Sequence, residues 1–251
     1  KIMKLSIITV CLNSKKTIEK TIKSIVNQDY KDYELIIIDG GSTDGTLKIL
    51  NQYKKWITYM VSEKDTGIYE AINKGIKVSS GEIISLIHSD DCLYDNQVLS
   101  NVVYNFKKNV ELDCLIGTTL ITKLNTKKII RKYSARHFKK WMMYFGVSPP
   151  HPSSFFKKKI YDNCGLYKVS YKIAGDFEFF LRTIIKNKIV IDTIDKNYVI
   201  MQHGGISSRS LQSNLISTKE IFKSFKDNKL YSNFFLISLR FPIKLFQFLF
   251  R

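Results

Sequence analysis

Acidic side chains and long apolar runs are both scarce in this chain of 251 residues. Its 22 Asp and Glu residues face 40 Lys and Arg residues, which leaves a formal net charge of +18. No uninterrupted apolar run reaches the length of about 18 residues that a membrane-spanning helix needs. The first apolar run, residues 5–10, is too short for the apolar part of a signal peptide, and no small-residue cleavage site follows it. The sequence therefore predicts neither a spanning helix nor a secretory leader.

Paired cysteines are also missing. The four cysteines are Cys11, Cys92, Cys114 and Cys164, and none has a neighbour at metal-binding spacing. We expect reduced, mostly buried thiols in a cytosolic chain rather than a disulfide framework or a zinc site.

The excess of positive charge favours an anionic partner. Nucleic acid, anionic lipid headgroups and phosphorylated substrates all fit, and a solvated lysine-rich surface is the alternative without a partner. An apolar fraction of 44% is ordinary for a globular protein and is enough to build a core. The length fits one large domain, or one domain with an appendage.

Two buried-type apolar runs each end in acid. Residues 35–38 run into Asp39, and residues 83–87 run into His88-Ser89-Asp90-Asp91. Such continuous apolar runs are typical of parallel strands, whose carboxyl ends form the ligand-binding edge of an open sheet. Two adjacent aspartates repel each other unless a cation or well-placed hydrogen-bond donors compensate them. The pattern predicts one shared site for a divalent metal and a phosphate-bearing ligand.

The first half of the chain alternates strands and helices. Strands are predicted at residues 5–11, 34–38, 57–62 and 83–87, and helices at residues 18–26, from 43 or 44 onward, and at 67–78. This order predicts an α/β fold with a mainly parallel central sheet and flanking helices. After residue 112 the pattern changes to short strands at 112–116, 118–123, 128–133, 189–191 and 198–202, with a helix at 176–186.

Six motifs occur in a recognisable order. They are residues 6–13 (SIITVCLN), 39–46 (DGGSTDGT), 65–76 (DTGIYEAINKGI), 89–91 (SDD), 151–156 (HPSSFF) and 174–178 (AGDFE). Together they resemble the family 2 glycosyltransferases, inverting enzymes with a nucleotide-sugar-binding domain of the GT-A type. The resemblance covers roughly residues 4–207.

The resemblance implies a set of nucleotide-sugar contacts. These are Thr9, Cys11, Asn13, Asp39, Asp65, Gly67, Asn73, Lys74 and Asp90. Asp39 would accept a hydrogen bond from the imide N–H of uracil, or would serve as a turn or helix-capping residue. Asp90 would hold the ribose hydroxyls or a metal-bound water. Ile72 is assigned to the core. Many relatives carry Arg at this position, so that phosphate contact is either absent here or supplied by Lys74.

The resemblance also implies the metal ligand and the catalytic base. Asp91 would bind Mn²⁺ or Mg²⁺, with His203 as a diphosphate or metal contact or else a structural histidine. Asp176 would take the proton from the acceptor hydroxyl, or cap its helix, or do both. Relatives often carry Glu before this Asp, where the chain has Gly175. His151 would lie on the acceptor side, and His88 would serve packing or support the site.

The last residues are basic and apolar. Arg240, Lys244, Gln247 and Arg251 share one helical stripe beside a wide apolar face, which suits a membrane interface. The alternative is a helix docked on the catalytic domain or in a dimer seam. We therefore divide the chain into a GT-A type domain, residues 1–215, and an amphipathic helical appendage, residues 216–251.

The sequence as a whole predicts an inverting, metal-dependent hexosyl- or N-acetylhexosaminyltransferase. A UDP-sugar is the expected donor, and a glycan or polyprenyl-linked saccharide of bacterial surface polysaccharide synthesis is the expected acceptor. We expect a cytoplasmic protein, peripheral on the inner face of an anionic membrane, with oligomers possible and nucleic acid not a partner. A nucleotidyltransferase on a similar fold and a basic nucleic-acid-binding protein are the alternatives, although neither a phosphate loop after the first strand nor a recognition module is visible.

Overall fold

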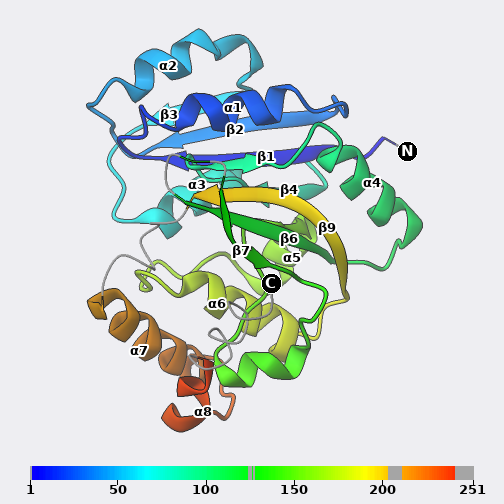
Figure 1. The fold of residues 1–251 in the computed structure, drawn as a ribbon, viewed down its shortest axis with the longest axis vertical. Helices are drawn as coiled ribbons and strands as arrows, with labels where there is room; N and C mark the ends of the chain where they lie inside the picture. Colours follow the sequence, from blue (N-terminus) through cyan, green and yellow to red (C-terminus); the bar gives the residue numbers. More distant parts are fainter. Residues whose placement is uncertain (1, 124–125, 127, 203–210, 241–251) are drawn as a thin grey trace.

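The computed structural model describes residues 2–123, 126, 128–202 and 211–240 (Figure 1). A single mixed sheet runs through it in the order β3-β2-β1-β4-β8-β6-β9-β5, with β7 paired to β6. The strands are β1 (Leu5–Cys11), β2 (Tyr33–Asp39), β3 (Tyr59–Ser62), β4 (Ile83–Leu86), β5 (Asp91–Leu93), β6 (Cys114–Thr122), β7 (Ile129–Tyr133), β8 (Ser154–Lys157) and β9 (Ile191–Gln202).

Helices cover both faces of this sheet. They are α1 (Ile18–Val26), α2 (Thr46–Gln52), α3 (Ile68–Val78), α4 (Val98–Lys108), α5 (Lys158–Cys164), α6 (Gly175–Phe180), α7 (Leu211–Asp227) and α8 (Phe234–Ser238). Short helical turns form η1 (Lys54–Trp56) and η2 (Lys140–Phe145), and a π-helical turn, η3 (Leu181–Lys186), continues α6. The predicted α/β architecture with flanking helices is confirmed.

Alternate side chains along β1 pack into two separate hydrophobic cores. Leu5, Ile7 and Cys11 pack with α1, α2 and α4, whereas Ile8 and Val10 pack with α3 and α6. Figure 1 shows α1 and α2 on one side of β1 and α6 and α7 on the other. Helix α3 lies so close to β1 that a Cβ on Gly75 would stand 2.4 Å from a methyl carbon of Ile8. Only glycine permits this approach.

The parallel half of the sheet follows the prediction closely. Strand β1 pairs in parallel with β2 and β4, and β2 pairs in parallel with β3. Helix α2 begins at Thr46 rather than at residue 43 or 44, because Asp44 turns back to accept the Thr46 backbone N–H at 2.9 Å.

The second half of the sheet differs from the prediction. The strands predicted at 112–116 and 118–123 are one strand, β6, and those at 189–191 and 198–202 are one strand, β9. Gly117 continues β6 because the Tyr198 ring covers it, leaving no room for a side chain. Strands β5 and β8 and helices α4 and α5 were not predicted. Within the described ranges, no helix is both long enough and apolar enough to span a bilayer.

Candidate active site

Three loops meet where β1, β2 and β4 end. Cys11 and Asp39 are register partners at the ends of β1 and β2, and β4 flanks β1 on its other side. The Ser14 hydroxyl lies 2.8 Å from that of Ser89, which links the loop after β1 to the Ser-Asp-Asp motif. The two acidic strand ends therefore lie on either side of β1, as the sequence predicts for a shared site.

Asn13 braces the loop after β2. Its backbone is left-handed, with φ of 50°, which asparagine tolerates better than most residues. Its N–H donates to Ser42 Oγ at 2.7 Å, and its Oδ1 accepts from the Thr43 N–H at 2.9 Å. The exposed Asn13 thus shapes the surface on which the predicted nucleoside would lie.

Asp39 stabilises the turn after β2, which is one of the two roles that the sequence leaves open for it. The residue is fully buried, and its carboxylate accepts from Ser42 N (2.9 Å), Ser42 Oγ (2.5 Å), Ser62 Oγ (2.6 Å) and Gly41 N (3.1 Å). Burial alone would raise the pKa of Asp39, but these hydrogen bonds outweigh it and lower the pKa. A uracil contact at this carboxylate would compete with donors already in place.

Thr9 and Cys11 lie under the same loops. Thr9 is fully buried and its hydroxyl has no hydrogen-bond partner, so a polar ligand atom there would satisfy it. Cys11 Sγ lies 3.4 Å from Asp39 Oδ1, and burial raises the pKa of this thiol, with the charge of Asp39 adding to the effect. Cys11 is therefore a neutral neighbour of the site.

Asp91 is the most unusual carboxyl group at these strand ends. It begins β5, is 1% exposed, and its Oδ1 is buried without a hydrogen-bond partner. Burial raises the pKa of Asp91 well above its usual range, and the charge of the adjacent Asp90 raises it further. Such a group is poorly matched to this site unless a cation or a donor joins it.

These residues fit the predicted divalent metal. Mg²⁺ is typically held by one or two carboxylates together with substrate phosphates, so Asp91 and Asp90 would suffice once a diphosphate is bound. Among the described residues, no cluster of three or more His, Cys, Asp and Glu side chains forms a metal cage. His203, the predicted additional contact, lies outside the described residues.

Asp65 and Lys74 form an ion pair beside the loop after β2. Lys74 Nζ lies 2.5 Å from Asp65, 2.7 Å from Glu63 and 3.5 Å from Glu70. The hydrogen bond that Lys74 donates to Asp65, followed by the one that it donates to Glu63, raises the pKa of Lys74. Asp65 itself lies against Gly40. Lys74 is thus surrounded by carboxylates, which disfavours its predicted role as a diphosphate contact.

The predicted nucleotide-sugar contact Asn73 is hydrogen-bonded within the protein. Its Nδ2 donates to the Tyr167 carbonyl at 2.7 Å, and its Oδ1 accepts from the Tyr167 N–H at 3.0 Å. Both polar groups are therefore used within the protein. Ile72 is buried as predicted, whereas Gly67, before the first turn of α3, is open to a ligand.

His151 joins the two ends of the site. Its Nε2 lies 2.8 Å from the hydroxyl of Tyr167, and its ring stacks at 6.1 Å on the ring of His88, which precedes Ser89 and the two aspartates. Burial lowers the pKa of His151 to about 4. Burial, followed by the nearby His151, also lowers the pKa of His88 to about 4 despite the charge of Asp90. Both rings are neutral at pH 7.

Asp176 is the second residue of α6, whose N-cap is Ala174 and has no side-chain capping hydrogen bond, so the cap alternative is wrong. Its Oδ1 accepts from the Phe177 N–H at 2.8 Å. Its charge contributes to raised pKa values at Tyr69, Tyr133 and Tyr167, after the larger effect of burial at each. The Asp176 N–H donates to Tyr69, and a series of contacts runs from Tyr69 through Tyr167 and His151 to His88. Asp176 and His88 therefore lie at opposite ends of this aromatic series.

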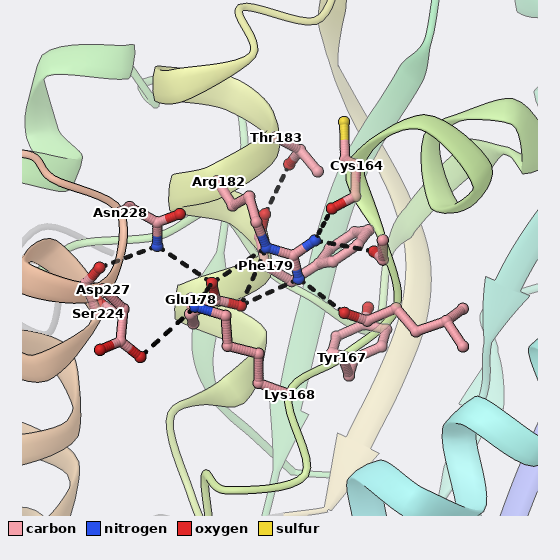
Figure 2. Close-up of polar contacts among 12 residues, drawn as sticks. Cys164, Tyr167, Lys168, Glu178, Phe179, Arg182, Thr183, Ser224, Asp227 and Asn228 are labelled. Atoms are coloured by element: carbon pink, nitrogen blue, oxygen red, sulfur yellow. Dashed lines mark hydrogen bonds and ion pairs between the residues drawn. The ribbon is translucent and has the colours of Figure 1, made fainter.

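A network of ion pairs and hydrogen bonds that the sequence does not predict holds α6 in place. Figure 2 shows Glu178 between Arg182, Lys168 and Asn228, with N–O distances of 3.1, 3.0 and 3.1 Å. Arg182 also donates to the carbonyls of residues 164–166. The spacing of Glu178 and Arg182 on one helix is visible in the sequence. Lys168 and Asn228 come from distant segments that no local pattern identifies.

The predicted membrane stripe loses one member. Arg240 is 2% exposed, and its Nη2 donates to Thr218 Oγ1 at 2.7 Å and to the carbonyl of Asn214 at 3.4 Å. Ile237 of α8 is fully buried, and α8 packs on η2 and α7. Residues 234–240 therefore follow the docked-helix alternative. The rest of the stripe, including Lys244 and Arg251, lies outside the described residues.

The predicted boundary at 215/216 falls inside α7. Ile221 and Phe225 of α7 belong to the same core as α3 and α6. The described part of the predicted appendage thus packs on the main body of the protein.

Known proteins of similar sequence carry glycosyltransferase names. The chain is 27% identical to the PGL/p-HBAD biosynthesis glycosyltransferase of Mycobacterium bovis over 180 residues, which are 70% of the chain and 68% of that protein. It is also 27% identical to the poly(ribitol-phosphate) beta-N-acetylglucosaminyltransferase TarP of Staphylococcus aureus over 253 residues, which are 92% of the chain and 74% of TarP.

Solved structures show a similar fold. S. aureus TarS 1-349 in complex with UDP-GlcNAc matches with a TM-score of 0.68 and 19% identity, covering 89% of this chain and 66% of that one. The mannosyltransferase PcManGT of Pyrobaculum calidifontis, in complex with GDP-Man and Mn²⁺, matches with a TM-score of 0.65 and 16% identity, covering 89% and 63%. The chain spans about two-thirds of the length of these solved structures. These likenesses support the predicted GT-A type fold.

The family model for glycosyl transferase family 2 matches residues 6–177, from the start of β1 into α6. That range includes every described residue that the sequence analysis placed in the site. The chain therefore belongs to glycosyl transferase family 2.

Proposed function

We propose that the protein transfers a hexosyl or N-acetylhexosaminyl group from a UDP-sugar to a hydroxyl group, with inversion at the anomeric carbon. The buried Asp91 carboxyl beside Asp90, whose Oδ1 has no hydrogen-bond partner, is the observation that carries this proposal. Asp91 lies at the strand ends where an open α/β sheet binds ligands. Its Oδ1, which has no partner, suits a divalent metal ion that also binds the diphosphate. Family membership leaves no support for the nucleotidyltransferase and nucleic-acid-binding alternatives.

The side chains have separate roles in this proposal. A bound Mn²⁺ or Mg²⁺ would neutralise charge on the leaving diphosphate. Asp91 and Asp90 would hold the metal and the ribose, while the loop braced by Asn13 and Asp39 would support the nucleoside. Asp176, at the opposite end of the aromatic series from His88, would accept the proton of the attacking hydroxyl. Neutral His151 would lie between donor and acceptor without adding charge.

We also propose a glycan or lipid-linked saccharide as the acceptor, at the cytoplasmic face of an anionic membrane. The names of two relatives refer to PGL/p-HBAD biosynthesis and to poly(ribitol-phosphate). The net charge of +18 favours an anionic surface, and the aromatic side chains of Phe234 and Phe235 on α8 are exposed.

A panel of nucleotide sugars tests the donor and the metal together. UDP-GlcNAc, UDP-glucose and GDP-mannose would each be incubated with the purified chain, with Mn²⁺ or with EDTA, without an acceptor. Slow release of UDP from a UDP-sugar, only with Mn²⁺, is the expected result. Release of GDP alone, or release that EDTA does not change, would contradict the proposed donor or the proposed metal.

A further inference from the structure

Two side chains from distant helices hold the backbone that carries Asp176. Glu220 of α7 accepts from the N–H groups of residues 172, 173 and 174 at 2.7, 2.9 and 2.8 Å. The Tyr69 hydroxyl accepts from the next two N–H groups, those of Gly175 at 2.8 Å and Asp176 at 3.4 Å. Five consecutive backbone donors are thus satisfied by only two side chains.

Tyr69 is fixed in place on all sides. It is 6% exposed, its own hydroxyl donates to the Ile173 carbonyl at 2.9 Å, and its ring stacks on Tyr167 at 5.9 Å. A Cβ on Gly175 would stand 2.6 Å from Cζ of Tyr69, so the close approach of this ring requires glycine at 175. The absence of a side chain at 175 therefore makes room for Tyr69.

Glu220 contacts the turn from a second helix, α7. It projects from α7, whose Phe225 packs against Phe177 of α6 with ring centroids 5.9 Å apart. The helices α3 and α7 are separated by more than half of the chain, yet both contact one turn of five residues. Figure 2 shows that the Glu178 network fixes the same short helix two residues beyond Asp176.

We propose that Tyr69 and Glu220 are positioning residues that fix the 172–176 turn, so that the Asp176 carboxylate keeps one location relative to the attacking hydroxyl. The inference rests on the proposed function, because it gives Asp176 the role of base. A displacement of about 1 Å in a reacting group can cost on the order of 10²-fold in rate. Neither Tyr69 nor Glu220 is proposed to contact the donor, so donor binding should not depend on them.

The experiment is a double-mutant cycle on the full chain, with a UDP-sugar that the panel identifies and with Mn²⁺. Tyr69→Phe and Glu220→Gln are each combined with Asp176→Asn. Each single variant should lower kcat by roughly 5- to 50-fold, with KM and UDP affinity within about twofold of the wild type. In the Asp176→Asn background the same changes should have no further effect, because they act only through that carboxylate.

Tyr104→Phe and Glu111→Gln are the matched controls, since both residues are exposed and far along the chain from the turn. Amide hydrogen exchange of residues 172–176 gives a second readout. Tyr69→Phe should speed exchange at 175 and 176, and Glu220→Gln at 172–174.

The outcomes separate this inference from the proposed function. Wild-type kcat in Tyr69→Phe and Glu220→Gln, while Asp176→Asn is impaired, would overturn the positioning roles alone. An equal loss with and without the Asp176 carboxylate, or unchanged exchange in the turn, would do the same. A wild-type rate in Asp176→Asn would overturn both, because Asp176 would then not be the base. Failure of every nucleotide sugar to bind would contradict the proposed function. Amide exchange in Tyr69→Phe and Glu220→Gln would still test whether these side chains hold the turn, because that measurement needs no substrate.

Discussion

At the scale of single residues, hydrogen-bond donors rather than burial distinguish Asp39 from Asp91. Asp39 is buried and fully supplied with donors, so its pKa is lowered and it stabilises a turn. Asp91 is equally buried but has an orphaned oxygen, so its pKa is raised. The same residue type thus has opposite pKa shifts on either side of β1, because both oxygens of Asp39 accept hydrogen bonds whereas Asp91 Oδ1 accepts none.

Asp91→Asn tests the metal assignment. The substitution preserves the shape of the side chain but removes its charge as a metal ligand. We expect the affinity for UDP in the presence of Mn²⁺ to fall by at least about tenfold. Thermal stability should stay the same or rise, because a buried carboxyl group with one unpartnered oxygen is removed. Titration calorimetry with and without Mn²⁺ measures this. Equal UDP affinity in the variant and the wild type would remove Asp91 from the metal site.

Gly175→Ala tests the close packing at the 172–176 turn. The added methyl group would meet ring atoms of Tyr69 at 2.6–2.8 Å, so the ring or the turn must move. Overpacking of this kind costs about 1–3 kcal/mol of unfolding free energy. Gly67→Ala is the control, because nothing lies within 4 Å of a Cβ at that position. Thermal and urea unfolding of both variants measure the difference, and equal stability would show that the turn yields easily.

At the scale of elements, the amino ends of the strands are held by one buried carboxylate. Glu34 of β2 is 5% exposed, accepts from Ser6 Oγ of β1 and from the Ser80 N–H at 2.5 Å each, and pairs with Lys4 at 2.9 Å. Burial opposes its charge, but these bonds outweigh burial and lower the pKa of Glu34 from 4.5 to about 2. The carboxylate therefore joins β1, β2 and the loop before β4.

Glu34 should make the protein sensitive to acid. Because its pKa is lower in the folded state, its stabilisation is complete above the unfolded pKa of 4.5 and disappears as the pH falls toward about 2. We expect Glu34→Gln to lose about 1–3 kcal/mol of unfolding free energy at neutral pH, and to lose less than the wild type on acidification. Urea unfolding at several pH values checks this, with Glu111→Gln, which is exposed, as the control. Parallel pH profiles of Glu34→Gln and the wild type would contradict it.

At the scale of the whole molecule, α7 and α8 close the lower face of the fold in Figure 1. Helix α7 supplies Glu220 to the 172–176 turn, and α8, with its buried Ile237, packs on α7 and η2. Arg240 is buried beside Thr218, so its charge is not available to a lipid surface. Membrane attachment, if it uses α8, must depend on the exposed Phe234 and Phe235.

Substituting both phenylalanines tests that attachment. Phe234 is 60% and Phe235 72% exposed, so replacing both with serine should leave the fold intact. We expect the double variant to sediment several-fold less with anionic phosphatidylglycerol vesicles, because apolar area that would enter the interface is lost. Tyr104→Ser with Val110→Ser, at exposed positions near α4, is the matched control. Equal sedimentation of all three proteins would place any membrane contact elsewhere.

The local pattern of the chain determined the parallel half of the sheet. Residues 5–11 read as a strand and form one, and the helices beginning at Ile18 and Ile68 follow from apolar spacing. The positions of Asp39, Asp90 and Asp91 at strand ends follow as well, since they terminate apolar runs. These features depend on neighbours in the sequence, which is why periodicity alone predicts them.

The tertiary structure decided how those residues are used. Asn73 and Lys74 carry polar groups suited to a ligand, but contacts with Tyr167, Asp65 and Glu63 engage them inside the protein. Glu220 lies 44 residues beyond Asp176 in the chain and Tyr69 lies 107 before it, and no local spacing relates them. The reason is physical: hydrogen bonds and packing across distant segments depend on the folded positions of both partners, and one-dimensional patterns do not contain those positions.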